Sequence, residues 1–146
     1  IILTQANSMG YAPKFFGCDG LDGILAMKNF DTKLAEGVML LTPFAADATD
    51  ELTQKFVAAY KKAYTDTPNQ FAADAYDAIY AIKAAAEAGK VTPSMKTSEM
   101  CTAMEKAMTT ITLTGLTGTI TWTADGEPSK TPKAVEIKDG AYVSMK

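Results

Sequence analysis

The chain has 146 residues, of which 47% are apolar and 21% are charged, so it can bury the core of one domain or of a large part of one. Its net charge of −3 gives it no attraction to nucleic acid or to an anionic membrane surface. The chain has no histidine, which excludes His-containing catalytic triads and His-ligated zinc. We therefore expect no metal site, no cofactor and no nucleic-acid partner. We also expect no enzyme, with a Lys-based catalytic site left open by the sequence.

The first ten residues read as the second half of a helix. Ile2, Ala6 and Met9 share one face, and Gly10 suits a left-handed cap at the C-terminal end. No capping residue precedes Ile1. We expect sequence upstream of this chain to be missing, any signal segment included.

Two short buried strands are predicted next. Phe15–Gly17 follows the turn at Pro13 and ends directly before Cys18 and Asp19, and a short helix is expected over 24–28. The continuous apolar run 38–42 is typical of a parallel strand buried on both faces.

Three helices are then predicted, starting at Thr49–Glu51, at about Phe71 and at Ser98. The expected inward stripes of the three helices are Leu52, Phe56, Ala59, Tyr60 and Ala63; Phe71, Ala75, Ile79, Ile82 and Ala86; and Met100, Ala103, Met104, Ala107 and Met108. The methionines are read as core filling rather than as ligands of a soft metal.

The C-terminal part changes to strands. Residues 117–122 alternate with period two, and 134–137 and 141–143 are predicted to pair across the turn Asp139–Gly140. Helices alternating with strands, followed by this β tail, place the chain in the α/β class.

Asp19 is the first candidate for a binding role, because ligands of open α/β sheets lie outside the carboxyl ends of strands. Its carboxylate could pair with a ligand ammonium, or it could instead complete a local turn with its own backbone. Phe71, in the first turn of a helix, could line an apolar pocket or be an ordinary core aromatic.

Two acids on the same helix, Asp74 and Asp77, are spaced i, i+3. A paired acid/base site is one interpretation; complementing the helix N-terminus or accepting bonds from nearby loops is the favoured one. Cys18 and Cys101 lack a CxxC spacing, and a disulfide and two free thiols both remain open.

Four segments, in this order, resemble the type I periplasmic solute-binding proteins of ABC transporters, in particular the branched-chain amino-acid binding family. The segments are Gln5–Tyr11 with Phe15–Gly20, similar to the family's GxDG/GxEG strand end; Glu36–Val38; Phe71–Tyr80, similar to its YDA helix; and Leu116–Ile120 with Asp125–Pro128. The resemblance implies an α/β clamp of two three-layer α/β/α lobes, of which this chain is the C-terminal part.

The resemblance also implies roles for particular residues. The acid at the GxDG position holds the ligand ammonium, which corresponds to Asp19 with Gly20 beside it, and the aromatic of the YDA helix contacts the ligand side chain, which corresponds to Phe71. The expected ligand-binding set is Asp19, Gly20, Phe71 and Asp74. Branched-chain binders generally carry Glu where this chain has Asp19, so the ligand is left open.

The resemblance implies the substrate-binding component of an importer that captures a small amino acid between two lobes; a ligand-sensing domain of the same fold is the alternative. The expected partners are the small-molecule ligand, a membrane permease and, for the isolated chain, a second copy of itself. The expected location is periplasmic or extracellular, with or without a lipid anchor. Residues 1–42 and those after about 130 are expected to be second-lobe-like, and about 43–125 first-lobe-like with the hinge crossings.

Overall fold

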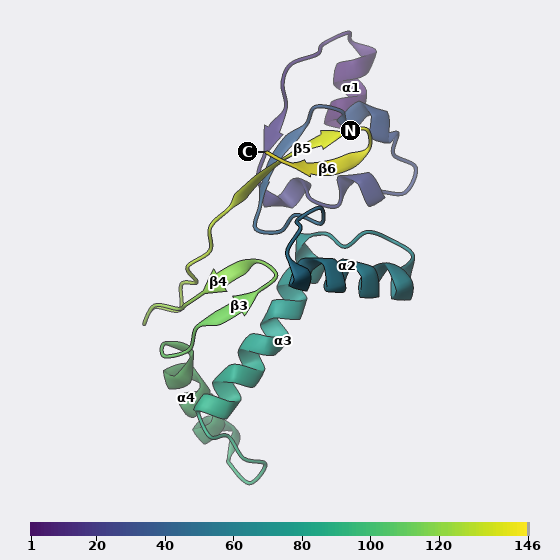
Figure 1. Ribbon diagram of the computed structural model, residues 1–146. Coiled ribbons are helices and arrows are strands. Elements are labelled where there is room, and N and C mark those ends of the chain that lie inside the picture. Colours follow the sequence, from purple (N-terminus) through teal and green to yellow (C-terminus); the bar gives the residue numbers. More distant parts are fainter. Residues whose placement is uncertain (146) are drawn as a thin grey trace. The chain divides into compact units, whose positions relative to one another are not determined.

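The computed structural model describes residues 1–145 and divides the chain into two compact units (Figure 1). The first unit contains Ile1–Gln70 and the C-terminal segment from Pro132, and the second contains Phe71–Thr131. The chain therefore passes from one unit to the other twice, after Gln70 and after Thr131. The sequence predicts lobe boundaries at about residue 42 and at about residues 125–130. These lobe boundaries remain a prediction.

A four-stranded mixed sheet forms the centre of the first unit, in the order β1-β2-β5-β6. β1 (Phe16–Gly17) is parallel to β2 (Met39–Thr42), β2 is antiparallel to β5 (Lys133–Lys138), and β5 is antiparallel to β6 (Ala141–Ser144). The last strands of the chain, yellow in Figure 1, thus complete a sheet begun by its first third. The buried core around this sheet consists of Ala35, Val38, Leu40, Ala45, Val135 and Ile137.

α1 (Ile2–Ser8) precedes β1. The 3-10 turns η1 (Asp19–Leu21), η2 (Ile24–Ala26) and η3 (Thr32–Ala35) connect β1 to β2, and the longer α2 (Glu51–Tyr64) follows β2. Gly10 has a φ of +66°, which agrees with the left-handed cap expected after α1. Asp50 caps α2, because its carboxylate accepts the N–H of Thr53 at 2.9 Å.

The expected apolar stripe of α2 is only partly correct. Thr53 and Val57 are buried, Phe56 and Tyr60 are half-buried, and the alanines Ala59 and Ala63 are exposed. The inward face of α2 is thus formed by two pairs at i, i+4 spacing, Thr53 with Val57 and Phe56 with Tyr60. Ala59 and Ala63 lie outside this face.

The second unit contains most of α3 (Gln70–Ala88), then α4 (Thr97–Met108) and the hairpin of β3 (Leu113–Gly115) and β4 (Gly118–Ile120). The expected inward stripe of α3 is wrong. Phe71, Ile79 and Ile82 are exposed by 50%, 66% and 55%, while the buried face carries Ala73, Asp77, Ala81 and Ala85. These small side chains leave room for close packing, and Asp77 is buried because it bonds the hairpin.

The expectations for α4 and for the C-terminal hairpin agree with the structure. Ala107 is buried and the three methionines of α4 are half-buried, so they lie on the inward face expected for them. Asp139 and Gly140, between β5 and β6, have φ values of 51° and 72°, which is the geometry of a tight two-residue hairpin turn.

Candidate functional site

Asp19 lies at the carboxyl end of β1, on the edge of the sheet where β1 and β2 run parallel. It is the first residue of η1, and its side chain is exposed. Within residues 1–145 its carboxylate makes no hydrogen bond or ion pair, so the Asx-turn alternative for this residue finds no support in the structure. An uncompensated carboxylate outside a strand end is available to a cationic group.

The backbone of Asp19 is held by Gln70, the first residue of α3. The side-chain Nε2 of Gln70 donates to the Asp19 carbonyl at 2.7 Å, and Gln70 is only 1% exposed. The Gln70 Oε1 lies 3.3 Å from the hydroxyl of Thr42, at the end of β2. The loop that carries the Asp19 carboxylate is therefore held in place by the buried side-chain amide of Gln70.

Asp22, three residues further on, fixes the other end of the same loop. One of its carboxylate oxygens accepts the backbone N–H of Gln70 at 2.7 Å and the other accepts the N–H of Gly23 at 2.8 Å. Gly23 has a φ of +88° and also donates to the Tyr142 hydroxyl at 2.9 Å. Burial, and next the charge of Asp22, raise the pKa of Tyr142 above its ordinary value, so this hydroxyl stays neutral.

Gly20 lines an apolar groove of about 370 Å³ in the first unit. A side chain at Gly20 would meet nothing within 4 Å, so packing does not require glycine there. The same groove includes Cys18, a free and exposed thiol, together with Phe16 and Leu21. Cys101 in the second unit is also a free, exposed thiol.

Phe71 and Asp74 lie one turn apart on α3, in the second unit. Half of the Phe71 surface is exposed, which disagrees with a role as an ordinary core aromatic. Asp74 is ion-paired with Lys130, and both side chains are about one-third exposed. The structure thus places Asp19 with Gly20 in one unit and Phe71 with Asp74 in the other.

Asp77 performs the loop-bonding role that the sequence favoured. It is 3% exposed and accepts the N–H groups of Leu116 and Thr117 at 2.8 and 2.9 Å, and the Thr117 hydroxyl at 2.7 Å. These two residues form the turn between β3 and β4. A buried carboxylate that accepts three of the protein's own donors is committed to holding this turn, which favours the structural interpretation over the paired acid/base one.

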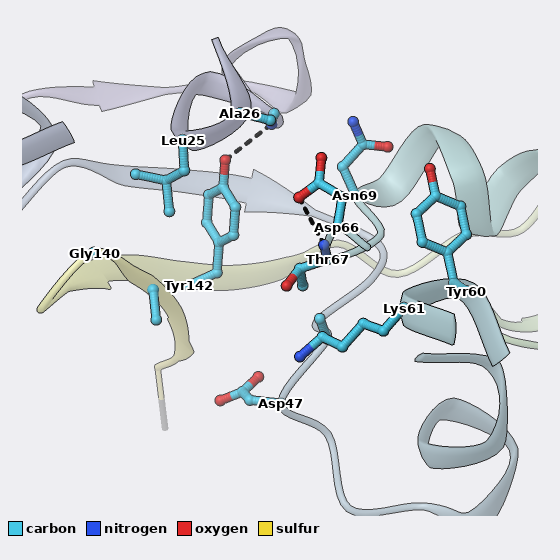
Figure 2. Close-up of a pocket in the computed structure, with 13 residues that line it drawn as sticks. Leu25, Ala26, Asp47, Tyr60, Lys61, Asp66, Thr67, Asn69, Gly140 and Tyr142 are labelled. Carbon is cyan, nitrogen blue, oxygen red and sulfur yellow. Dashed lines mark hydrogen bonds between the residues drawn. The ribbon is translucent and has the colours of Figure 1, made fainter. Parts of the chain in front are cut away.

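A separate pocket of about 450 Å³ in the first unit is shown in Figure 2. Tyr60 and Lys61 of α2, the loop that contains Asp66, and Tyr142 of β6 surround it. Several of its polar groups have internal partners: Asp66 accepts the N–H of Thr67, and Asp47 accepts both the N–H and the hydroxyl of Ser144. None of the four expected site residues lines this pocket.

Residues 1–145 contain neither a candidate metal cluster nor a candidate membrane span. That range contains no cluster of three or more acidic or cysteine side chains with the geometry to hold a metal ion. In the same range, every helix is too short or too polar to span a bilayer.

The sequence did not identify the two residues that hold the Asp19 loop, Asp22 within it and Gln70 at the start of α3. Asp22 stands between Gly20 and Gly23, and Gln70 follows Pro68–Asn69 at the expected start of a helix, so both occupy positions typical of turns and caps. Their pairing joins positions 48 residues apart, and no local pattern indicates it.

Comparison with protein families gives one match, a family model described as periplasmic binding protein, which covers residues 2–141. The curated proteins contain no significant match. Among solved structures, a solute-binding protein of an ABC transporter from R. palustris in complex with benzoate is 20% identical, with a TM-score of 0.79. A leucine-binding protein from Thermotoga maritima is 23% identical, with a TM-score of 0.74.

A branched-chain amino acid transporter substrate-binding protein from Streptococcus pneumoniae, in complex with isoleucine, is 24% identical with a TM-score of 0.77. All three superpose on 99% of this chain, which in turn spans 38%, 40% and 41% of their own lengths. At these identities the likeness concerns the fold, and it confirms the fold class expected from the sequence.

Proposed function

Because the chain belongs to the periplasmic binding protein family, we propose that the protein is the substrate-binding component of an ABC importer and captures a small amino acid between two lobes. The family is one of binding proteins of the periplasm or cell exterior rather than of enzymes. Branched-chain amino acids are the first candidates, since two of the similar structures are named for leucine or isoleucine binding.

The observation that carries this proposal is the Asp19 carboxylate. It is exposed at the carboxyl end of a parallel strand, it has no partner within residues 1–145, and its backbone is held by the buried Gln70. An ammonium group is the natural complement, because charge-assisted hydrogen bonds to a carboxylate are stronger than neutral ones. Asp19 is thus assigned to the ligand's ammonium.

The other members of the proposed set have different support. Phe71 offers an exposed apolar ring on α3, suited to contact an apolar ligand side chain. Gly20, with open space where a side chain would be, leaves room for a ligand to approach the backbone. Asp74 already pairs with Lys130, so its role in binding requires the ligand to compete with that ion pair.

The first test is a thermal-shift screen of the full-length protein against the twenty amino acids and benzoate. A ligand that binds only the native state raises Tm by mass action. We expect a shift for one or a few apolar amino acids. A shift with benzoate alone would contradict the amino-acid assignment, since benzoate has no ammonium group.

The second test is the affinity of Asp19→Asn for the best amino acid, measured by calorimetry. Removing one partner of a buried charge pair costs about 2–5 kcal/mol, so we expect at least about a 30-fold loss. Asp139→Asn is the matched control, because Asp139 is exposed in the same unit and asparagine tolerates its positive φ. Equal affinities of the two variants would refute the ammonium assignment.

We also propose that a membrane permease receives the ligand. The protein is proposed to work outside the cytoplasmic membrane, with or without a lipid anchor.

The 146-residue chain alone is proposed to associate with a second copy of itself. β1 is the edge strand of its sheet, and Phe16 and Ile2 beside it are exposed by 60% and 70%. Light scattering of the isolated chain at micromolar concentration tests this, and a monomer would contradict it.

A further inference from the structure

Gln70 connects the loop of residues 18–23 to two other segments of the first unit. Its Nε2 donates to the carbonyl of Asp19 and its backbone N–H donates to the carboxylate of Asp22, each at 2.7 Å. Its Oε1 lies 3.3 Å from the Thr42 hydroxyl at the end of β2. The Gln70 side chain thus contacts Asp19, which is 51 positions away in the sequence, and Thr42, which is 28 positions away.

The centre of this network is buried, and its bonds to Asp19 and Asp22 are partly buried. Gln70 and Thr42 are 1% and 3% exposed, and within residues 1–145 every buried side-chain nitrogen or oxygen has a partner. Because an unpaired polar group is costly in a low-dielectric interior, such a network holds its members in one arrangement. The Asp19 backbone is therefore fixed on its buried side while its carboxylate faces outward.

Resting on the proposed function, we infer that Gln70 is a positioning residue for amino-acid binding: it presets the Asp19 carboxylate for the ligand ammonium by holding the Asp19 carbonyl. A preset loop loses less conformational freedom when the ligand arrives, which raises affinity without any contact between Gln70 and the ligand. Gln70 is also the last residue before the chain enters the second unit, so the loop is fixed to the start of α3.

The test compares Gln70→Leu with Gln54→Leu in the full-length protein. Gln54 is the matched control, because it is exposed in the same unit and also donates from Nε2 to a backbone carbonyl, that of Ala48. The probes are leucine and 4-methylpentanoate, its analogue without the amino group. Gln70→Leu should weaken leucine about tenfold and leave the analogue within about twofold, because only leucine uses Asp19.

A double-mutant cycle separates positioning from a general loss of stability. Once Asp19→Asn has removed the charge, adding Gln70→Leu should cost leucine little further affinity, because the two changes disable one interaction. Equal losses for leucine and its analogue, or additive losses in the cycle, would overturn the inference. Gln70→Met, an uncharged side chain of similar length without the donor, serves the same comparison if the leucine variant does not fold.

Hydrogen exchange of the ligand-free protein tests the hold on the loop independently. The N–H groups of Leu21 and Asp22, which bond the carbonyls of Cys18 and Asp19, should exchange faster in Gln70→Leu than in Gln54→Leu. Unchanged exchange overturns the inference whatever the ligand. If the wild type binds no amino acid, the proposed function fails, and faster exchange would still support the hold of Gln70 on this loop.

Discussion

The carboxylate of Asp77 accepts both the backbone N–H and the hydroxyl of Thr117, at 2.9 and 2.7 Å, from 40 positions away in the sequence. Together with the N–H of Leu116, these donors attach the β3–β4 turn to the middle of α3. The middle of α3 therefore turns its acid, rather than its isoleucines, inward.

Asp77→Ala should destabilise the protein by about 3 kcal/mol, because it leaves two buried N–H groups and a buried hydroxyl without acceptors. Urea denaturation measures this. Asp74→Asn is the control, and loss of its partly exposed ion pair with Lys130 should cost no more than about 1 kcal/mol. Similar costs for the two variants would refute a structural role for Asp77.

Gly115→Ala should also destabilise the second unit, by about 1–3 kcal/mol, because the added methyl group would collide with the Asp77 carboxylate. Gly20→Ala is the matched control, since a methyl group there meets nothing within 4 Å. Thermal denaturation of both variants gives the comparison. A stable Gly115→Ala variant would mean that the hairpin approaches α3 less closely than the structure has it.

Phe71→Ala should weaken binding of leucine more than binding of glycine, because the exposed ring is assigned to an apolar ligand side chain. Calorimetry with the two amino acids on the full-length protein measures the difference. Ile82→Ala, which removes another exposed apolar side chain of α3, should change neither affinity. Equal losses for leucine and glycine in Phe71→Ala would make the ring merely structural.

Asp50 should stabilise α2 in a pH-dependent manner. The Thr53 N–H lowers the pKa of its carboxyl below the ordinary value of 3.8. Its contribution is therefore present above pH 3.8 and is lost as pH falls through the lower folded value. Asp50→Ser, a cap that does not titrate, should lose less stability between pH 5 and about 2 in urea denaturation. Parallel curves for both proteins would contradict this.

Tyr142 should contribute to alkaline sensitivity. Burial raises its pKa above 10.0, so the stability that its neutral hydroxyl contributes is present below pH 10 and is lost as pH rises through the higher folded value. Tyr142→Phe should unfold at higher pH than the wild type, followed by circular dichroism. The exposed Tyr64→Phe serves as control, and equal shifts for the two would refute the assignment.

The bounds of several helices and strands followed from local signals, whereas β3 and the 3-10 turns η1 and η3 were not predicted. Gly10 ends α1, Asp50 starts α2 and Asp139–Gly140 turns the last hairpin, because caps and tight turns depend on residues within one turn of chain. The acid at the end of β1 was equally visible, since a short apolar run followed by Cys18–Asp19–Gly20 marks a strand end.

Local sequence signals did not predict which face of α3 is buried. Phe71, Ile79 and Ile82 make the more apolar stripe, yet the helix buries alanines and Asp77 because the packing partner is a hairpin turn with N–H groups to satisfy. The sequence alone determined that Asp19 lies just beyond the end of a strand. Only the tertiary structure decided that Gln70 and Asp22 fix its loop, because hydrogen bonds spanning some 50 positions exist only after the chain has folded.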